Sequence, residues 1–252
     1  MSRYCAVIPS YNHVSALPRV LAYLQNLQLP SIIIDDGSSA QNKETIEALQ
    51  SNFSLSRLYR FEINQGKGQA VMYGLKKAYE LGFSHALQID ADGQHTLEDI
   101  EHFLAKSQSA PEVLFSGFPK YDSTAPLSRV YGRKITNFWV SVETWSTCLK
   151  ESMCGFRIYP LAAISTLFSK RLSKRMGFDI DVLVRLYWQG VPISYIETKV
   201  NYPVQNHSNF KMLRDNLAIS GLHTKLFFLM FYYMPRLKCI TKARVKHGQK
   251  NK

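Results

Sequence analysis

The chain has 252 residues, of which 46% are hydrophobic and 20% are charged. These proportions exclude a disordered chain, and the length allows one domain of α/β size with a C-terminal appendage. The four cysteines show neither a C-x-x-C pair nor the spacing of a zinc site, so we expect reduced thiols and no structural disulfide. Because the N-terminus enters a strand pattern instead of a signal peptide, and no run of about 18 apolar residues occurs, we also expect a cytoplasmic protein without a membrane span.

The net charge of +12 is unevenly distributed along the chain. Residues 1–120 contain 10 basic and 12 acidic residues, whereas residues 121–252 contain 21 basic and 7 acidic residues. Seven of these cations lie between Arg236 and Lys252, after the apolar aromatic run 226–234. This combination is typical of a peripheral protein on an anionic membrane surface, and a buried helix with a solvated tail is the alternative. We expect no nucleic-acid partner, because no recognised binding motif accompanies the charge.

Strand and helix patterns alternate along the first 120 residues. Apolar runs predict strands at 4–8, 31–35, 57–62, 85–90 and 112–118, and helical periodicity predicts helices at about 15–28, 42–51, 67–81 and 97–107. Later patterns predict a helix at 129–148, a strand at 152–160, helices near 160–168 and 179–188, a strand at 192–200, a loop at 201–209 and a long last helix. This order predicts an α/β fold with a mostly parallel sheet covered by helices.

The same patterns predict three units. Residues 1–210 form the main domain, 211–240 an amphipathic membrane-proximal helix, and 241–252 a basic, disordered tail. Ligands of such sheets bind outside the carboxyl ends of the strands, so the polar residues at three strand ends should converge on one pocket.

Asp35 and Asp36 follow the second predicted strand, where a carboxylate can accept a hydrogen bond from a base or a ribose. The third helix opens with the Gly-Lys-Gly sequence 66–68, which can place backbone N–H groups and the Lys67 ammonium against phosphate. It is neither a Walker A loop nor a dinucleotide fingerprint, because Val71 stands where the third glycine should be. A plain turn and a simple glycine-containing helix start are the alternatives.

Asp90 and Asp92 lie two residues apart where the fourth predicted strand ends, and Gly93 follows them. Strand alternation points both carboxylates to one side, and the glycine lets the chain turn away, so both can face the pocket. A hard divalent cation held by one or two carboxylates and by substrate phosphates fits such a pair, and a solvated turn is the alternative. So many acids at strand ends require a cation or a donor to offset their repulsion. We expect His95 to support the pair or contact solvent, and not to bind the metal.

Four motifs in succession resemble the signatures of family 2 glycosyltransferases, and the resemblance extends over about 200 residues. They are IPSYN at 8–12, IDDGS at 34–38, NQGKGQA at 64–70 and DADGQH at 90–95. The resemblance is closest to the branch that includes dolichol- and polyprenyl-phosphate sugar synthases. It implies a GT-A fold, a nucleotide-sugar donor, and Mg²⁺ or Mn²⁺ between the diphosphate and the acidic pair.

The resemblance also implies roles for single residues. The nucleotide would contact Pro9, Tyr11, Asn12, Asp35 or Asp36, Lys67 and Asp90, while Asp90 and Asp92 would hold the sugar and the metal. Relatives often carry an Asp shortly before a Gly-Phe-Arg sequence, and here the acid is Glu151 before Arg157. Arg157 either approaches a phosphate or forms a structural salt bridge.

An inverting reaction needs a general base for a hydroxyl acceptor, whereas an ionised phosphate acceptor needs none. Asp179 and Asp181 stand at the start of a predicted helix, where the family places a late acid. Asp181 is preferred for the chemistry and Asp179 for capping the helix. The segment 202–210 resembles a loop that closes over the donor in relatives, and its arginine is absent here, so His207 and Lys211 are the candidates to stabilise the leaving group.

The sequence thus predicts a hexosyltransferase on the cytoplasmic, inner face of a membrane. It would move a sugar, with a UDP-sugar favoured, to a lipid-linked or polyprenyl-phosphate acceptor in cell-envelope glycolipid or polysaccharide synthesis. One alternative is a membrane-recruited nucleotide-binding protein without turnover, which the intact Asp90 and Asp92 disfavour. The other is a nucleotidyltransferase, disfavoured because residues 9–12 replace its glycine-rich basic loop. The sequence does not predict an oligomeric state.

Overall fold

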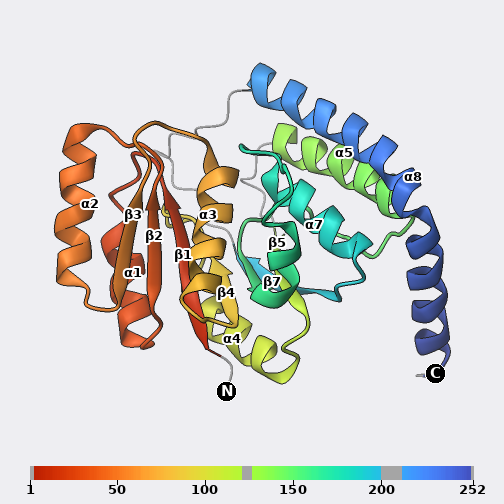
Figure 1. The fold of residues 1–252 in the computed structure, drawn as a ribbon, viewed down its shortest axis with the longest axis horizontal. Helices are drawn as coiled ribbons and strands as arrows, with labels where there is room; N and C mark the ends of the chain where they lie inside the picture. The colour runs from red at the N-terminus through yellow and green to blue at the C-terminus, as the bar shows by residue number, and fades with distance from the viewer. Residues whose placement is uncertain (1–2, 121–126, 200–211, 251–252) are drawn as a thin grey trace.

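The computed structural model describes residues 3–120, 127–199 and 212–250, which form a central sheet with helices on both faces (Figure 1). The strands are β1 (Tyr4–Ser10), β2 (Ser31–Asp35), β3 (Ser56–Arg60), β4 (His85–Gln88), β5 (Leu114–Lys120), β6 (Arg157–Pro160) and β7 (Ile193–Lys199). The helices are α1 (Leu17–Asn26), α2 (Ala40–Asn52), α3 (Lys67–Glu80), α4 (Asp99–Ser109), α5 (Leu127–Thr144), α6 (Leu161–Ile164), α7 (Phe178–Trp188) and α8 (Met212–Lys250). A short 3-10 turn, Ser165–Leu167, follows α6.

The sheet has the strand order β3-β2-β1-β4-β6-β5-β7 within the described residues. Strands β3, β2, β1 and β4 are parallel, and β5 pairs with β7 in parallel. Strand β6 runs antiparallel to both β4 and β5. The prediction of an α/β fold with a mostly parallel sheet is therefore confirmed, with one reversed strand in its centre.

Two apolar clusters cover the two faces of the sheet, because successive side chains of each strand point to opposite sides. In β1, Ala6 and Ile8 face the cluster that contains α1, α2 and α4, whereas Cys5 and Val7 face α3. Both faces are buried, which explains why the strands read as nearly continuous apolar runs. The second cluster continues into α5, α7 and α8.

Helices α5, α7 and α8 of the C-terminal half lie beside the sheet (Figure 1). Every residue of α7 is buried, and α7 lies in contact with both α5 and α8. Helix α8 extends to Lys250, so it does not end at the predicted boundary of 240, and its C-terminal part runs in a different direction from the rest (Figure 1). Pro235 lies inside the helix, which is a usual cause of such a bend, and good helix formers continue beyond it.

Among the described residues, one segment of α8, Arg214–Pro235, is long and apolar enough to cross a membrane, and 28% of it is buried inside the protein. Length and composition alone are weak evidence that this segment crosses a membrane. The expectation from the sequence that the protein has no membrane span therefore stays a prediction. The segment is interrupted by His223 and Lys225, which is why no unbroken apolar run is visible in the sequence.

Candidate functional site

The carboxyl ends of β1, β2 and β4 lie next to one another at one edge of the sheet. Ser10 is paired with Asp35 across β1 and β2, and β4 is paired with β1 on the other side. Beyond the strands, the backbone N–H of Asp36 donates to the carbonyl of Ser10 at 2.8 Å. The topology therefore brings the polar motifs of three strand ends to one place.

Asn12 ties the loops that follow β1 and β2 to each other. It adopts a left-handed conformation with φ of 55°, which asparagine tolerates better than most residues. Its N–H donates to Ser38 Oγ at 2.9 Å, and its Oδ1 accepts from the Ser39 N–H at 2.9 Å and from Asn42 Nδ2 at 3.0 Å. Nearby, Pro9 is buried and Tyr11 is half-buried. The nucleotide contacts of these three residues stay predictions.

Asp35 and Asp36 are both buried and hold the loops at this edge of the sheet. Asp35 accepts hydrogen bonds from the Ser38 N–H at 3.0 Å and from Arg60 Nε at 2.7 Å. Asp36 accepts from the N–H groups of Gln65 at 2.7 Å and Gly66 at 2.8 Å. Burial raises the pKa of Asp36, and these two N–H groups oppose the rise. Asp36 thus fixes the loop that leads into α3.

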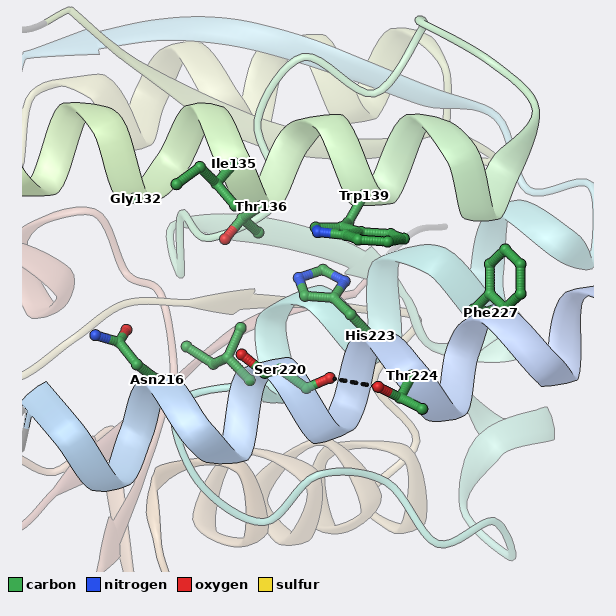
Figure 2. A pocket seen from close by; sticks show the side chains of 10 residues that line it. Gly132, Ile135, Thr136, Trp139, Asn216, Ser220, His223, Thr224 and Phe227 are labelled. Atoms are coloured by element: carbon green, nitrogen blue, oxygen red, sulfur yellow. Dashed lines mark hydrogen bonds between the residues drawn. The ribbon is translucent and has the colours of Figure 1, made fainter.

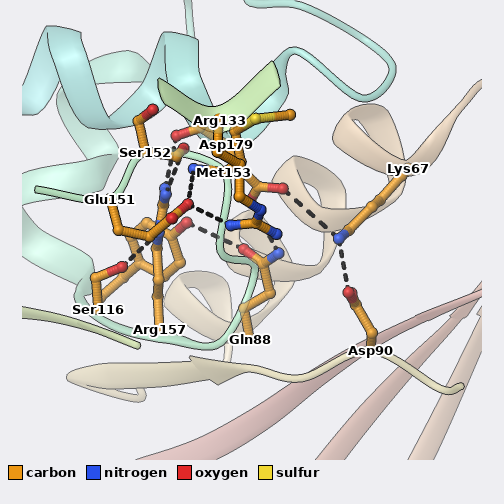
Figure 3. Close-up of polar contacts among 11 residues, drawn as sticks. Lys67, Gln88, Asp90, Ser116, Arg133, Glu151, Ser152, Met153, Arg157 and Asp179 are labelled. Carbon is orange, nitrogen blue, oxygen red and sulfur yellow. Dashed lines mark hydrogen bonds and ion pairs between the residues drawn. The ribbon is translucent and has the colours of Figure 1, made fainter. Parts of the chain in front are cut away.

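Lys67, the first residue of α3, lies between two carboxylates (Figure 3). Its Nζ lies 2.7 Å from Asp90 Oδ2 and 3.6 Å from Asp179 Oδ2. Burial acts to lower the pKa of Lys67, but Asp90 and Asp179 outweigh it and leave that pKa raised. Burial conversely acts to raise the pKa of Asp90, and the ammonium of Lys67 leaves it lowered. The lysine stays charged and offsets part of the negative charge of the site.

The acidic pair retains capacity for a cation. Among the described residues, Asp90 Oδ1 is buried and has no hydrogen-bond partner. Asp92 Oδ1 accepts a hydrogen bond from the backbone N–H of Gln94 at 3.0 Å. Burial and the charge of Asp90 raise the pKa of Asp92. Within the described part of the chain no three His, Cys, Asp or Glu side chains form a metal-binding group. The pair therefore fits a metal that takes one or two carboxylates and completes its shell with phosphate oxygens and water.

A buried polar chain behind this site was missed by the sequence reasoning. The Tyr159 hydroxyl donates to Gln88 Oε1 at 3.0 Å, and Gln88 Nε2 donates to Asp179 Oδ1 at 3.1 Å. Gln88 is fully buried in β4, and a glutamine inside an apolar run is the signal that could have revealed it, because a buried amide needs partners. A Cβ on Gly155 would lie 2.8 Å from Lys67 Nζ and 2.9 Å from Gln88 Nε2, so this glycine leaves room for the cluster.

The two acids at the start of α7 occupy different surroundings from those predicted. Gly177 is the N-cap of α7, so the expectation that Asp179 caps the helix is wrong. Asp179 instead faces Lys67 and Gln88 (Figure 3). Asp181 is fully buried, accepting from the Ser173 N–H at 2.8 Å and from Arg185 Nε at 2.5 Å. The geometry thus places Asp179, and not the preferred Asp181, beside the acidic pair.

Arg157 and Glu151 lie on the other side of Gln88 from Lys67 and Asp90 (Figure 3). Arg157 is fully buried and donates to Ser116 Oγ at 3.1 Å, to the carbonyl of Asp179 at 2.7 Å and to the carbonyl of Ser152 at 2.9 Å. Its guanidinium therefore holds the start of α7 in place through carbonyls, and neither of the two predicted roles describes these contacts. Glu151 Oε1 accepts from Arg133 Nη1 of α5 and from the Met153 N–H, both at 2.6 Å.

His95 stacks on Phe156 with ring centroids 4.9 Å apart, and its buried Nδ1 has no hydrogen-bond partner within the part of the chain that the structure describes. Burial lowers the pKa of His95, whereas the negative charges of Asp90 and Asp92 act to raise it. The remaining candidates, His207 and Lys211, lie outside the described residues.

Comparison with known proteins agrees with this geometry. A family model described as "Glycosyl transferase family 2" matches residues 5–159. The chain is 28% identical to a UDP-N-acetylglucosamine–dolichyl-phosphate N-acetylglucosaminyltransferase of Methanococcus voltae, over 92% of this chain and 94% of the relative. It is 23% identical to a dolichyl-phosphate beta-glucosyltransferase of Saccharomyces cerevisiae, over 92% and 77% of the two chains. It is also 23% identical to an undecaprenyl-phosphate mannosyltransferase of Micrococcus luteus, over 79% and 85%.

Among solved structures, the chain resembles glucosyl-3-phosphoglycerate synthase from Mycobacterium tuberculosis in complex with Mn²⁺, UDP-glucose and phosphoglyceric acid. The TM-score is 0.65 at 14% sequence identity, over 94% of this chain and 80% of the other. At this identity the likeness shows a shared GT-A fold.

Proposed function

Since the chain belongs to glycosyl transferase family 2 and is a glycosyltransferase, we propose that it transfers a sugar from a nucleotide-sugar donor to a polyprenyl-phosphate or other lipid-linked acceptor, with inversion at the sugar carbon. The observation that carries this proposal is the acidic pair at the sheet edge, where Asp90, beside Lys67, has a buried oxygen that no described residue hydrogen-bonds. A UDP-sugar is the favoured donor. The names of the relatives from three organisms support the acceptor class.

Asp90 and Asp92 are the residues that would hold a divalent cation together with the donor diphosphate. When bound, such a cation offsets the charge that develops on the departing nucleotide. Lys67 adds a fixed positive charge on the same side of the site. The Mn²⁺ and UDP-glucose of the Mycobacterium tuberculosis structure support this assignment, and either Mg²⁺ or Mn²⁺ suits the oxygen ligands.

Asp179 is the proposed general base for a hydroxyl-bearing acceptor. Its carboxylate is held by Gln88 Nε2 on one oxygen and lies 3.6 Å from Lys67 on the other, so its orientation is fixed before substrate binds. The Arg157 guanidinium fixes the backbone of the same residue. For an ionised phosphate acceptor, Asp179 would instead orient Lys67 and the sugar.

The acceptor class and the charge of the second half support a position on an anionic, cytoplasmic membrane face. In this proposal residues 1–210 form the transferase, 211–240 the membrane-proximal helix, and 241–252 a basic extension that adds positive charge.

The test uses the purified protein with a panel of UDP- and GDP-sugars, undecaprenyl or dolichyl phosphate in detergent micelles, and Mg²⁺ or Mn²⁺. We expect one donor to give a sugar-lipid product, with Asp92→Ala lowering the rate roughly 100-fold or more, a typical loss for an electrostatic group of a site. Glu98→Ala, which changes a nearby exposed carboxylate, is the matched control.

Undiminished transfer by Asp92→Ala would contradict the assignment of the site. Donor binding without turnover would support the binding-protein alternative. Release of a sugar phosphate, with the nucleoside monophosphate transferred, instead of release of a nucleoside diphosphate would support the nucleotidyltransferase.

A further inference from the structure

The carboxylate of Asp179 is held by a polar chain of two buried side chains, Gln88 of β4 and Tyr159 of β6. Gln88 Nε2 donates a hydrogen bond to Asp179 Oδ1 at 3.1 Å (Figure 3). The Tyr159 hydroxyl donates in turn to Gln88 Oε1 at 3.0 Å. Gln88 and Tyr159 are fully buried, and Asp179 is 3% exposed. One end of this polar chain is thus the residue that is proposed above as the general base.

The reversed direction of β6 brings these side chains together. Strands β4 and β6 are antiparallel, with Gln88 opposite Arg157 and Ala86 opposite Tyr159. Paired residues share one face of a sheet, and residues two apart on a strand point to the same side, so Gln88, Arg157 and Tyr159 lie on one face. Tyr159 is a diagonal neighbour of Gln88, within reach of a long aromatic side chain. Strand pairing, and not a loop, therefore sets the position of the polar chain.

The hydroxyl of Tyr159 determines which way the amide of Gln88 points. Burial raises the pKa of Tyr159 to about 12, so this hydroxyl keeps its proton at neutral pH and can donate. An amide that accepts through Oε1 presents its donor, Nε2, at the other end. An ionised carboxylate only accepts hydrogen bonds, so the reversed amide would set the acceptors Gln88 Oε1 and Asp179 Oδ1 against each other. Tyr159 therefore favours the one orientation in which Gln88 supports Asp179.

The two carboxylate oxygens of Asp179 consequently have different surroundings. Oδ1 accepts from Gln88, whereas Oδ2 lies 3.6 Å from Lys67 Nζ, which is the distance of an ion pair and not of a hydrogen bond. The backbone carbonyl of Asp179 accepts from Arg157 at 2.7 Å. The main chain and one oxygen are thus fixed, which leaves Oδ2 as the oxygen that can take a proton.

We propose that Gln88 and Tyr159 are positioning residues of the reaction, which hold Oδ1 of Asp179 and leave Oδ2 to remove the proton of a hydroxyl acceptor. The inference rests on the proposed function, in which Asp179 is the general base. Oδ2 takes the proton while the acceptor oxygen bonds to the sugar carbon. The bond from that carbon to the diphosphate breaks, and its electron pair leaves on the nucleoside diphosphate. A turned carboxylate would lose the alignment that this transfer needs.

The test measures hydrolysis of the donor found in the panel, that is, transfer of the sugar to water, with the purified protein and Mg²⁺ or Mn²⁺. Water carries a proton that a base must remove, so the assay applies whether the natural acceptor is a hydroxyl or a phosphate. Gln88→Leu should lower kcat roughly 100-fold, a usual cost of a misplaced reacting group. Tyr159→Phe should lower kcat roughly tenfold, because it removes one hydrogen bond. The Kd of both variants for the donor, measured by calorimetry, should equal that of the wild type.

The double variant Gln88→Leu/Tyr159→Phe distinguishes positioning from stability. If Tyr159 acts through Gln88, the loss of its hydroxyl should not lower kcat further once residue 88 is leucine. The thermal midpoint should behave differently, because Gln88→Leu leaves the buried Tyr159 hydroxyl without its acceptor and the second change removes that hydroxyl. The double variant should therefore unfold at a higher temperature than Gln88→Leu and yet be no more active.

Two matched controls lie away from the site. Tyr4→Phe, at the start of β1, removes a hydroxyl that donates to Ser107 Oγ at 3.2 Å. His223→Leu, like Gln88→Leu, replaces the buried partner of a carboxyl group, here Glu143 at 2.7 Å, and His223 lines a pocket between α5 and α8 (Figure 2). Both controls should hydrolyse the donor as the wild type does. His223→Leu should still lower the thermal midpoint, because Glu143 stays buried without this partner.

Four results would overturn the positioning role. They are a wild-type kcat in Gln88→Leu, a further loss of kcat in the double variant, a kcat that recovers together with the thermal midpoint, and an equal loss of kcat in His223→Leu. A wild type that neither hydrolyses a donor nor transfers its sugar would overturn the proposed function instead.

Discussion

Asp179 and Asp181 stand two residues apart at the start of α7, yet their carboxylates lie in opposite surroundings. Successive residues of an α-helix are rotated by about 100°, so residues two apart point to opposite sides. Asp179 consequently faces Lys67 and the acidic pair, whereas Asp181 faces Arg185 in the interior. The sequence assigned Asp181 to the chemistry and Asp179 to the cap, and the helical phase instead turns Asp179 toward Lys67.

Substituting each acid with asparagine should separate chemistry from stability. Asp179→Asn should lower kcat at least roughly 100-fold with little change in thermal midpoint, the usual loss for a proton acceptor. Asp181→Asn should lower the free energy of unfolding by about 3 kcal/mol, because it leaves the buried Arg185 without its partner. Rates at saturating substrate and urea unfolding of both variants provide the check.

The reverse pattern, a stable but inactive Asp181→Asn with an active Asp179→Asn, would restore the original preference for Asp181. An active Asp179→Asn that uses only phosphate acceptors would show that the reaction needs no base.

Sequence motifs located the acidic pair and Lys67 because they end strands or begin a helix, where side chains converge at a sheet edge. Gln88 and Tyr159 escaped notice because they lie inside buried strands, where only three-dimensional pairing reveals that one polar side chain satisfies another. Asp36 was expected to meet the nucleotide, and its hydrogen bonds to the loop before α3 could not be foreseen from a motif.

At the scale of elements, α5 and α8 are joined by the buried pair of Glu143 and His223. Burial raises the pKa of Glu143, and the hydrogen bond and charge of His223 oppose that rise. Asp181 of α7 adds a further negative charge that also raises this pKa. The contact between the two helices therefore includes a carboxyl group whose pKa is raised.

The stability of the α5–α8 pairing should depend on pH through Glu143. Because its folded-state pKa lies above the ordinary value of 4.5, the folded protein binds this proton more tightly than the unfolded chain. The stabilisation from protonated Glu143 is fully present below the unfolded pKa and is lost as pH rises through the folded pKa. The difference in free energy of unfolding between His223→Gln and Glu143→Gln/His223→Gln isolates Glu143, because neither variant contains the imidazole of His223.

Urea unfolding between neutral pH and pH 4.5 measures this difference. Lowering the pH should stabilise His223→Gln relative to the double variant, by roughly 1.4 kcal/mol for each unit by which the pKa is raised. If the stability advantage of His223→Gln over the double variant shrinks as pH falls, the folded-state pKa of Glu143 lies below 4.5, which contradicts the expectation.

Periodicity predicted the existence and type of nearly every described element, because both faces of the sheet and at least one face of each long helix are buried. It did not predict that β6 runs antiparallel between β4 and β5. A strand of four buried residues carries the same apolar pattern in either direction, so its pairing reveals its direction only in three dimensions. The continuation of α8 was missed for another reason, since its basic composition resembles a solvated tail.

At the scale of the whole molecule, the two halves of the chain divide the work of the proposed reaction. The first half supplies the strand ends and the acidic pair and has slightly more acidic than basic residues, 12 against 10. The second half supplies α5, α7 and α8 and has 21 basic against 7 acidic residues. Positive charge and exposed apolar side chains thus occur together in the half that would meet a membrane, while the nucleotide motifs lie in the other.

This division predicts that membrane binding depends on where charge is removed. The variant Arg236→Gln/Lys238→Gln/Lys242→Gln/Arg244→Gln removes four of the seven C-terminal cations, and a control variant removes four exposed cations of the first half, Arg19, Arg57, Lys76 and Lys106. In sedimentation with anionic vesicles the first variant should lose up to about 1 kcal/mol of binding free energy per cation, and the control should bind as the wild type does. Neutral vesicles should not distinguish the proteins, and added salt should reduce the difference because it screens the attraction. Equal losses in both variants would mean that net charge, and not the C-terminal segment, determines attachment.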